Sequence, residues 1–311
     1  MKEAVDAMRS AFAALSAGKA VVPLRSHLEV PEHQGVLLLM PCYLPSANAL
    51  SLKAVSVFDR NPAHGLPRIQ ALVTLYDGST GRALAVMDGA AVTALRTGAA
   101  SGAATDLLAR PDAATVAIFG AGVQARTQLE AVCAVRAIRT VRVFDTMPGA
   151  ADAYACEMSA AVGVEVLAAA SASQAVHQAD IICVATSSKT PVFADADLKP
   201  GVHINAVGSY QPTVQEIPTE TVLRARVIVD HRESALAETG DLLVPIRQGC
   251  YSADRVAAEL GEVVSGAKPG RTTADEITFF KSVGVAIQDL AAASRILTNA
   301  RQLRLGTSVP L

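Results

Sequence analysis

Apolar and polar residues follow two different patterns along the chain. From Thr115 onward, short apolar and β-branched runs alternate with helix-like or looped segments, starting with TVAIF at 115–119 and QARTQLEAVCAV at 124–135. Such near-continuous apolar strands suit a parallel sheet that is covered on both faces. The same pattern predicts further strands at 140–145, 164–168, 179–186, 201–208 and 225–230. We therefore predict an α/β domain over residues 112–282, a Rossmann-type, doubly wound parallel sheet.

The first 111 residues have a different organisation. An amphipathic helix, MKEAVDAMRSAFAALSAG, is followed by strand-like runs with only short connections between them. These runs are VVPLRSH, QGVLLLMP, LSLKAVSVF, IQALVTLYD and ALAVMDG, and the turn-rich GSTGR joins the last two as in a hairpin. Strands that follow strands predict an α+β domain over residues 1–111, in front of the Rossmann domain.

The segment AIFGAGVQAR, at the end of the first Rossmann strand, has the spacing G-x-G-x-x-A. Gly120 suits the tight turn, Gly122 brings bare backbone to a pyrophosphate, and Ala125 lets the helix pack against the strand. Asp145 ends the next strand, where a carboxylate accepts hydrogen bonds from the adenosine ribose, and no arginine follows it to favour a 2′-phosphate. The sequence therefore predicts NAD in preference to NADP, and a solvated strand end remains the alternative for Asp145.

Three basic residues are candidates for binding an anion. Both faces of the strand LSLKAVSVF are largely apolar, and the charged amine of Lys53 is costly there unless it meets an anion such as a ligand carboxylate. Arg96 stands in the Ala- and Gly-rich stretch MDGAAVTALRTGAASGAATDLLAR, and Arg25 lies in VVPLRSH. Arginine suits bidentate recognition of a carboxylate. The alternatives are a lysine on an edge strand that reaches solvent, and arginines on an ordinary surface or domain interface.

Composition and charge narrow the class of partner. The chain has 311 residues, of which 51% are apolar, and a formal net charge of −2. This is enough to fill the cores of two domains, and no run of Lys or Arg indicates a nucleic-acid surface. Short apolar stretches and the absence of a signal-peptide pattern predict a cytoplasmic protein that does not enter a membrane. Its five cysteines lack metal-type spacing and are expected to be buried free thiols, and no metal site is implied.

Eight segments spread along the chain form a recognisable set: PLR (23–25), LLLMP (37–41), LKAVSVF (52–58), TLYDGSTGRALAVMDG (74–89), ALRTGAASGAATDLLAR (94–110), IFGAGVQAR (118–126), GVHINAVGS (201–209) and SVGVAIQDLAAA (282–293). Together they resemble the ornithine cyclodeaminase/mu-crystallin family. The resemblance implies a substrate-binding domain that forms a homodimer through its sheet, an NAD-binding domain after it, and a C-terminal helix, within 283–311, that returns to the first domain. It also implies an enzyme of amino-acid metabolism in which Arg25, Lys53 and Arg96 hold the substrate carboxylate beside the nicotinamide. By the same resemblance, Lys53 is expected to donate a proton to the reacting nitrogen.

The cofactor of such an enzyme is expected along the carboxyl ends of the Rossmann strands, where ligands bind in these sheets. Asn205 is expected to line the nicotinamide pocket, and His203, inside the same apolar strand, is interpreted as a packing residue. The residues expected to contact the cofactor are Thr97, Gly120, Gly122, Val123, Gln124, Ala125, Asp145, Thr146, Ala185, Thr186, Ser187, Val207, Gly208 and Ser209.

Other charged residues are given no role in the chemistry. Asp230, Glu238 and Asp241 fall in a polar region and are expected to be solvated. Asp289 lies in the returning helix and is expected to cap it or to pair internally.

One departure from the family pattern bears on the reaction. Ornithine cyclodeaminases and related archaeal alanine dehydrogenases have an aspartate after the block equivalent to VHINAVG, where this chain has Ser209 and Tyr210. Cyclodeamination needs a group that manages protons while ammonia leaves, whereas imine reduction needs an anchored carboxylate, a hydride donor and one proton source. We therefore expect a reductase of a small cyclic imino acid (a ketimine) such as pyrroline-2-carboxylate. The alternatives are ornithine cyclodeaminase, an alanine dehydrogenase-like activity and, less favoured, a non-enzymatic binding protein.

Overall fold

The computed structural model describes residues 1–309, which form two compact units. One unit contains residues 1–16 and 97–284, and the other contains residues 17–96 and the chain from Val285 onward. The boundary falls inside helix α2 (Gly89–Leu108). The predicted boundaries, with 1–111 and 283–311 in one domain and 112–282 in the other, differ from this division in the place of the first helix and of most of α2.

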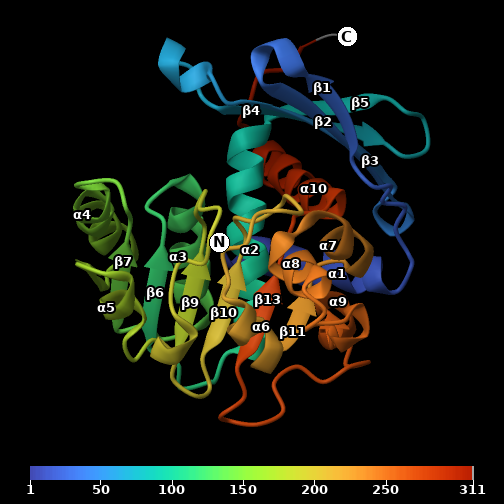
Figure 1. Cartoon of the computed structure of the whole chain (residues 1–311). Helices are drawn as coiled ribbons and strands as arrows, with labels where there is room; N and C mark the ends of the chain where they lie inside the picture. The colour runs from blue at the N-terminus through green and yellow to red at the C-terminus, as the bar shows by residue number, and fades with distance from the viewer. Residues whose placement is uncertain (310–311) are drawn as a thin grey trace. The chain divides into compact units, whose positions relative to one another are not determined.

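The first unit is built on an eight-stranded parallel sheet with helices on both faces (Figure 1). The strands are β6 (Thr115–Phe119), β7 (Thr140–Phe144), β8 (Glu165–Ala168), β9 (Ile181–Val184), β10 (His203–Ala206), β11 (Arg226–Val229), β12 (Ala258–Glu259) and β13 (Thr278–Lys281), in the order β12-β11-β13-β10-β9-β6-β7-β8. The chain moves from β6 outward to β8 and then returns to β9 on the other side of β6, so the order reverses between these two strands. That reversal confirms the doubly wound class, and it marks the crevice where such sheets bind ligands.

Strands β12 and β13 are absent from the predicted set. β13, with the sequence TFFK, lies inside the sheet between β10 and β11, and all four of its residues are buried. Its final lysine interrupts the apolar pattern that identifies the other buried strands.

Helices cover the two faces of the parallel sheet because alternate strand residues point to opposite sides. Ile118 packs with Leu129 and Tyr154 on the face covered by α3 and α4, whereas Ala117 and Phe119 belong to the core of the other face. Besides the part of α2 from Thr97 onward, the helices of this unit are α1 (Lys2–Ser16), α3 (Val123–Val135), α4 (Ala150–Val162), α5 (Ala172–Val176), α6 (Thr219–Arg224), α7 (Arg232–Glu238), α8 (Gly240–Arg247) and α9 (Leu260–Val264), with short 3-10 turns at η4 (Asp195–Asp197) and η5 (Ala253–Arg255).

Helix α1 belongs to this unit because of its apolar stripe. Val5, Met8 and Phe12 are buried at helical spacing, and the helix packs against α9 and α3. The ring of Phe12 meets that of Phe280 edge to face, with centroids 6.4 Å apart. The predicted amphipathic helix is therefore present, and its apolar face packs within the unit of the parallel sheet.

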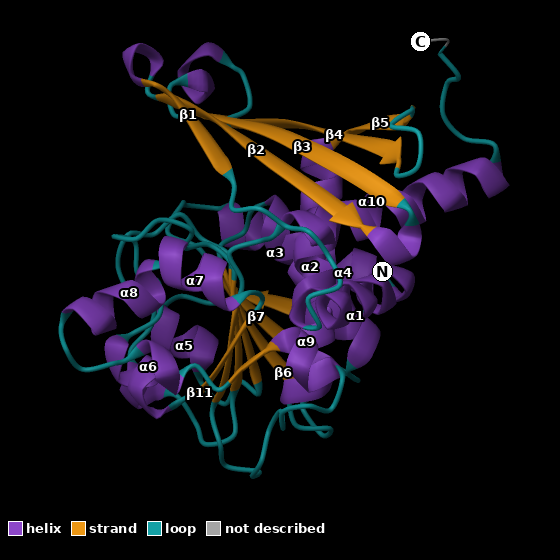
Figure 2. Ribbon diagram, turned by 90° about the vertical axis from the view of Figure 1, so that its right-hand side faces the viewer, coloured by secondary structure: helices purple, strands orange, loops and turns teal. Residues whose placement is uncertain are grey.

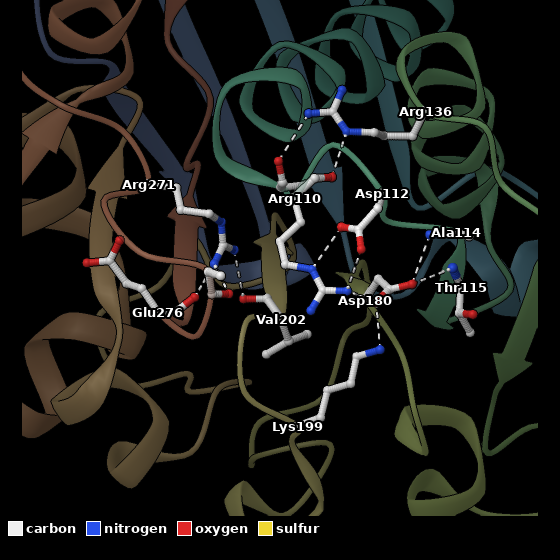
Figure 3. Close-up of polar contacts among 12 residues, drawn as sticks. Arg110, Asp112, Ala114, Thr115, Arg136, Asp180, Lys199, Val202, Arg271 and Glu276 are labelled. Atoms are coloured by element: carbon white, nitrogen blue, oxygen red, sulfur yellow. Dashed lines mark hydrogen bonds and ion pairs between the residues drawn. The ribbon is translucent and has the colours of Figure 1, made fainter.

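A polar network fastens the amino ends of the parallel strands (Figure 3). Asp180, which precedes β9, accepts hydrogen bonds from the backbone N–H groups of Ala114 and Thr115 at 2.8 and 2.9 Å. Its other carboxylate oxygen accepts from Lys199 at 2.6 Å and from Arg110 at 3.3 Å. One carboxylate thus ties the starts of β6 and β9 to two surrounding loops.

The second unit is a five-stranded antiparallel sheet with one long helix, α10 (Ala286–Leu303), against it (Figure 2). Its strands are β1 (Ser26–Val30), β2 (Gly35–Leu44), β3 (Ala49–Phe58), β4 (Ile69–Asp77) and β5 (Ala83–Asp88), in sequential order, with short 3-10 turns at η1 (Pro31–His33), η2 (Pro45–Ala47) and η3 (Asn61–His64). This is the predicted α+β arrangement, including the β4–β5 hairpin, but of the predicted strand run VVPLRSH only Ser26 and His27 lie in a strand, so Arg25 precedes β1. Helix α10 packs on β2, β3 and β4, so one face of the sheet is covered.

All five cysteines carry free thiols, but the expectation that they are buried is correct only in part. Cys42 and Cys183 are buried, Cys133 is half-buried, and Cys156 and Cys250 are exposed. Cys156 lies on the side of α4 away from its buried residues Tyr154 and Met158, which explains its exposure. Within residues 1–309, no helix combines the length and apolar character needed to cross a bilayer.

Candidate active site

The glycine segment forms the turn between β6 and α3. Gly120 has a φ of 89°, which favours glycine, and a Cβ there would lie 2.5 Å from the carbonyl oxygen of Ala185. At Gly122, by contrast, no described atom lies within 4 Å of the position that a Cβ would take. Ala125 is fully buried where α3 meets the sheet. The three small residues thus provide a turn, an open stretch of backbone and a close helix contact.

Asp145 and Gln124 add polar groups beside this turn. The Asp145 carboxylate accepts hydrogen bonds from the backbone N–H groups of Ala121 and Met147, each at 2.8 Å, so it faces back toward the glycine segment. The side-chain oxygen of Gln124 is buried without a hydrogen-bond partner among residues 1–309. Buried polar atoms are normally paired, so this acceptor is suited to a donor from a ligand. With the N–H groups at the start of α3, these residues fit a dinucleotide.

A buried carboxyl group holds the segment that follows β9. Glu216 accepts, through Oε1, hydrogen bonds from the backbone N–H and the hydroxyl of Thr186, at 3.1 and 2.5 Å. Its Oε2 has no hydrogen-bond partner in the described part of the chain, and a Cβ on Gly208 would overlap this carboxyl group. Burial raises the pKa of Glu216 to about 7, against the opposing effect of Lys281. Glu216 therefore lies against the segments that follow β9 and β10, and nothing in the local sequence around it signals this role.

Lys281 and Asp241 form an ion pair next to Glu216. The Lys281 Nζ lies 2.9 Å from Asp241 Oδ2, and both side chains are fully buried. Asp241 Oδ1 also accepts from the backbone N–H groups of Glu216 and Ile217, at 2.7 and 3.1 Å. An ion pair in such a place needs these additional hydrogen bonds to offset the loss of hydration.

The expectation that Asp230, Glu238 and Asp241 are solvated is wrong for Asp230 and Asp241, which are buried. Asp230 is fully buried, and its Oδ2 accepts from the backbone N–H groups of Val283 and Gly284 at 2.9 and 2.8 Å. Asp241 is buried in the ion pair with Lys281, and Glu238 is half-buried. The buried carboxylates of Asp230 and Asp241 accept hydrogen bonds from backbone N–H groups, which replace the water that burial removes.

Other residues near the carboxyl ends of the strands have their side chains engaged inside the first unit. Asn205 donates to the hydroxyl of Thr105 at 2.9 Å, so its amide nitrogen is engaged inside the first unit. Ser209 donates to the carbonyl oxygen of Val214 at 2.5 Å, and Thr97 is buried, with its carbonyl oxygen accepting from Gln128. Val123, Thr146 and Ser187 are exposed at this edge, and Ala185, Val207 and Tyr210 are half-buried.

His203 has the packing role that the sequence predicts. Its ring is buried between Thr278 Oγ1 at 3.0 Å and Asn205 Oδ1 at 3.1 Å. Burial lowers the pKa of His203 to about 3, so the ring is neutral at physiological pH. A neutral histidine with both nitrogens engaged has no part in proton transfer at the site.

In the second unit, Lys53 and Arg96 converge on one carboxylate of α10. The Lys53 Nζ lies 2.8 Å from Asp289 Oδ2, and the Arg96 Nε lies 3.1 Å from Asp289 Oδ1. Arg96 also donates from Nη1 to Gln288 Oε1 at 2.8 Å. Lys53, Arg96 and Asp289 are all buried, and β3 is the central strand of its sheet, so an edge-strand lysine that reaches solvent is excluded.

The charges around Lys53 form a compact set. Burial lowers the pKa of Lys53 to about 8; Asp289 acts in the opposite direction, and the charges of Arg96 and Arg25 lower the pKa further. Arg25 is half-buried and close enough to act on Lys53, so the structure brings the three predicted basic residues into one electrostatic environment. Asp289 does pair internally, as predicted, but it pairs with two of the candidate substrate ligands. In the sequence, the polar pair Gln288–Asp289 stands out in the otherwise apolar start of helix α10, and this is the signal that identifies Asp289 as a candidate.

Comparison with known proteins gives consistent matches over the whole chain. The sequence model of the Ornithine cyclodeaminase/mu-crystallin family matches residues 1–303. A Delta(1)-pyrroline-2-carboxylate reductase of Bacillus cereus is 40% identical over 310 residues, covering 99% of this chain and 95% of that protein.

Two solved structures have the same fold over nearly their full length. The Thermococcus litoralis Delta(1)-pyrroline-2-carboxylate reductase in complex with NADH and L-proline matches with a TM-score of 0.96 and 44% identity, covering 99% of this chain and 96% of that chain. An archaeal alanine dehydrogenase dimer with bound NAD matches with a TM-score of 0.93 and 36% identity, covering 100% of this chain and 95% of that chain.

Proposed function

Because the chain belongs to the ornithine cyclodeaminase/mu-crystallin family, we propose that it is an NAD-dependent reductase of a small cyclic ketimine such as pyrroline-2-carboxylate. The observation that carries the proposal is the buried, partly neutralised cluster of Lys53, Arg96 and Asp289, which offers cationic groups and one proton donor. Several relatives bear the name of this reductase, and the Thermococcus litoralis structure holds L-proline, the compound that reduction of the cyclic imine yields.

The chain's own residues supply binding and the proton. Arg25, Lys53 and Arg96 bind the substrate carboxylate, because guanidinium groups recognise carboxylates through paired N–H donors. With a pKa of about 8, Lys53 is mostly protonated at neutral pH and gives a proton to the imine nitrogen. The bound nicotinamide supplies the hydride to the imine carbon. One C=N double bond thereby becomes a C–N single bond with a new C–H and a new N–H bond.

The cofactor is NAD(H), and NADPH is the weaker alternative. The open backbone at Gly122, the carboxylate of Asp145 and the Gln124 side-chain oxygen, which has no hydrogen-bond partner among the described residues, support this part of the proposal. Thr146 is exposed and no arginine follows Asp145 in the sequence, while the nearby Arg126 guanidinium is paired with Glu157. The proposed contacts are Thr97, Gly120, Gly122, Val123, Gln124, Ala125, Asp145, Thr146, Ala185, Thr186, Ser187, Val207, Gly208 and Ser209.

A second copy of the chain is the proposed partner. The pairing register of β3, β4 and β5 places Leu72 and Val86 on the face of the antiparallel sheet opposite to Lys53. These side chains are 57% and 61% exposed. Leu28, at the edge of the sheet, is 60% exposed. An apolar sheet face of this kind marks an interaction surface, and the archaeal alanine dehydrogenase is a dimer. The proposed location is the cytoplasm, which suits free thiols.

The test is oxidation of NADH by the purified protein with pyrroline-2-carboxylate, followed by absorbance. Parallel reactions contain NADPH, pyruvate plus ammonia with NADH, and L-ornithine with NAD. We expect rapid oxidation with the cyclic imine and NADH, and none in Lys53→Met, which retains NADH binding. Proline and ammonia formed from ornithine, with no turnover of the cyclic imine, would instead identify a cyclodeaminase. Unchanged activity in Lys53→Met would remove Lys53 from the mechanism.

A further inference from the structure

The carboxylate of Asp289 occupies a distinctive place in the second unit. Each of its oxygens meets a different cation: Oδ2 lies 2.8 Å from Lys53 Nζ, and Oδ1 lies 3.1 Å from Arg96 Nε. Its side chain is only 1% exposed, so water contributes little to its stabilisation. A buried carboxylate shared in this way fixes the positions of both cations.

The titratable and charged groups that face Lys53 come from several elements. Arg96 ends the part of α2 in this unit, Arg25 precedes β1, and Asp289 lies on α10. On the neighbouring strand β2, burial and the charge of Asp289 raise the pKa of the Cys42 thiol to about 12, so this group is neutral. Asp289 is therefore the anion that balances Lys53 among neighbouring cations.

Taking the proposed reductase function as given, we propose that Asp289 is a positioning residue that holds Lys53 in its protonated form and aims it, together with Arg96, at the substrate. The proton passes from Lys53 Nζ to the imine nitrogen: one N–H bond of the ammonium breaks and the N–H bond of the product amine forms. Lys53 is left as a neutral amine, and Asp289 remains an anion hydrogen-bonded to Arg96. Lys53 then takes a proton from water before the next turnover.

The magnitude of the effect decides whether this role matters. An opposite charge within about 4–6 Å shifts a pKa by roughly 1–3 units. The pKa of Lys53 is already as low as about 8, so losing Asp289 brings it to neutral pH or below. Lys53 is then a neutral amine for at least about half of the time at neutral pH, and that form cannot donate the proton that the reduction consumes.

The experiment compares Asp289→Asn with Gln288→Leu. Both residues contact Arg96 from α10, but an ion pair with Lys53 is made by Asp289. The readouts are the pH profile of kcat/KM for the cyclic imine and an NMR titration of Lys53 in protein containing 13C-lysine, with the resonance assigned by Lys53→Met. We expect Asp289→Asn to lower both the basic limb of the profile and the NMR midpoint by roughly 1–3 units.

The control is expected to keep both midpoints within about half a unit of the native protein, because the charge beside Lys53 is unchanged. An unchanged Lys53 midpoint in Asp289→Asn overturns the proposal, as does an equal shift in Gln288→Leu. Because the NMR midpoint does not depend on catalysis, a shifted midpoint in a protein that fails to reduce the cyclic imine refutes the substrate and leaves the role of Asp289 intact. Asp289→Ser removes the same charge with a smaller side chain and replaces the asparagine variant if the latter does not fold.

Discussion

The amino ends and the carboxyl ends of the parallel strands each hold a carboxyl group that accepts hydrogen bonds, but the two groups serve different purposes. At the amino ends of the strands, both oxygens of Asp180 receive two hydrogen bonds each, from Ala114, Thr115, Lys199 and Arg110 (Figure 3). At the carboxyl ends, Glu216 receives two hydrogen bonds on one oxygen and, within residues 1–309, none on the other. A carboxylate with every lone pair engaged fastens loops, whereas a buried one left half-satisfied marks a place built for something more than packing.

Among the variants that test this difference between the strand ends, we expect Lys281→Met to have the largest effect on stability. The substitution leaves the Asp241 carboxylate buried without its counter-ion, and breaking such a pair costs about 3–5 kcal/mol. We expect the free energy of unfolding in urea to fall by that amount. Adding Asp241→Asn to the same chain should restore most of the loss, because the amide oxygen still accepts the N–H groups of Glu216 and Ile217. A double variant as unstable as the single one contradicts the ion-pair account.

Glu216→Gln tests the half-satisfied carboxyl group through pH. The pKa of Glu216 in the folded protein, about 7, lies above its ordinary value of 4.5, so ionisation opposes folding. The protonated form of Glu216 contributes its full stabilisation of the folded protein below pH 4.5. This contribution, about 3 kcal/mol, is lost as the pH rises through 7. Glutamine cannot ionise and lacks this dependence.

The measurement is the difference in free energy of unfolding between the native protein and Glu216→Gln at several pH values. The native protein should lose stability relative to the variant as the pH rises from 4.5 to 7. A difference that stays constant over this range would show that Glu216 titrates normally.

Asp180→Asn tests the carboxylate at the amino ends of the strands. The amide replaces one acceptor oxygen by a donor, which leaves backbone or side-chain donors unpaired at a cost of roughly 1–3 kcal/mol. Because this site lies at the amino ends of the strands, we expect the unfolding free energy to fall and the affinity for NADH, measured by calorimetry, to stay the same. If Asp180→Asn lost as much NADH affinity as a variant at the glycine turn, the proposed difference between the amino and carboxyl ends of the strands would be wrong.

The sequence predicted what local patterns encode. The strand TVAIF, the G-x-G-x-x-A turn and the hairpin around GSTGR each depend on neighbouring residues, and each is present in the structure. The buried charges could not be predicted in this way, because their partners lie far along the chain: Lys53 meets Asp289, and Asp241 meets Lys281. Local periodicity assigns an isolated aspartate to water, and only the tertiary fold shows that the residue is enclosed.

We expect the smallest effect on stability at Gly122. A substitution there is also the most direct test of whether a dinucleotide binds at the carboxyl ends of the strands. Gly122 has a φ of −84°, which any residue adopts, and no described atom lies near its missing Cβ, so Gly122→Val should lower the unfolding free energy by only about 1 kcal/mol, the cost of a valine at the N-cap of α3. The same valine fills the space predicted for the pyrophosphate, so NADH affinity should fall by about tenfold or more, or about 1.4 kcal/mol. Gly120→Ala is the matched control, because its φ of 89° and its approach to Ala185 make any side chain costly for folding itself. Calorimetric titration with NADH and urea unfolding of both variants separate the two roles. If Gly122→Val bound NADH as tightly as the native protein, the dinucleotide would not lie over this turn.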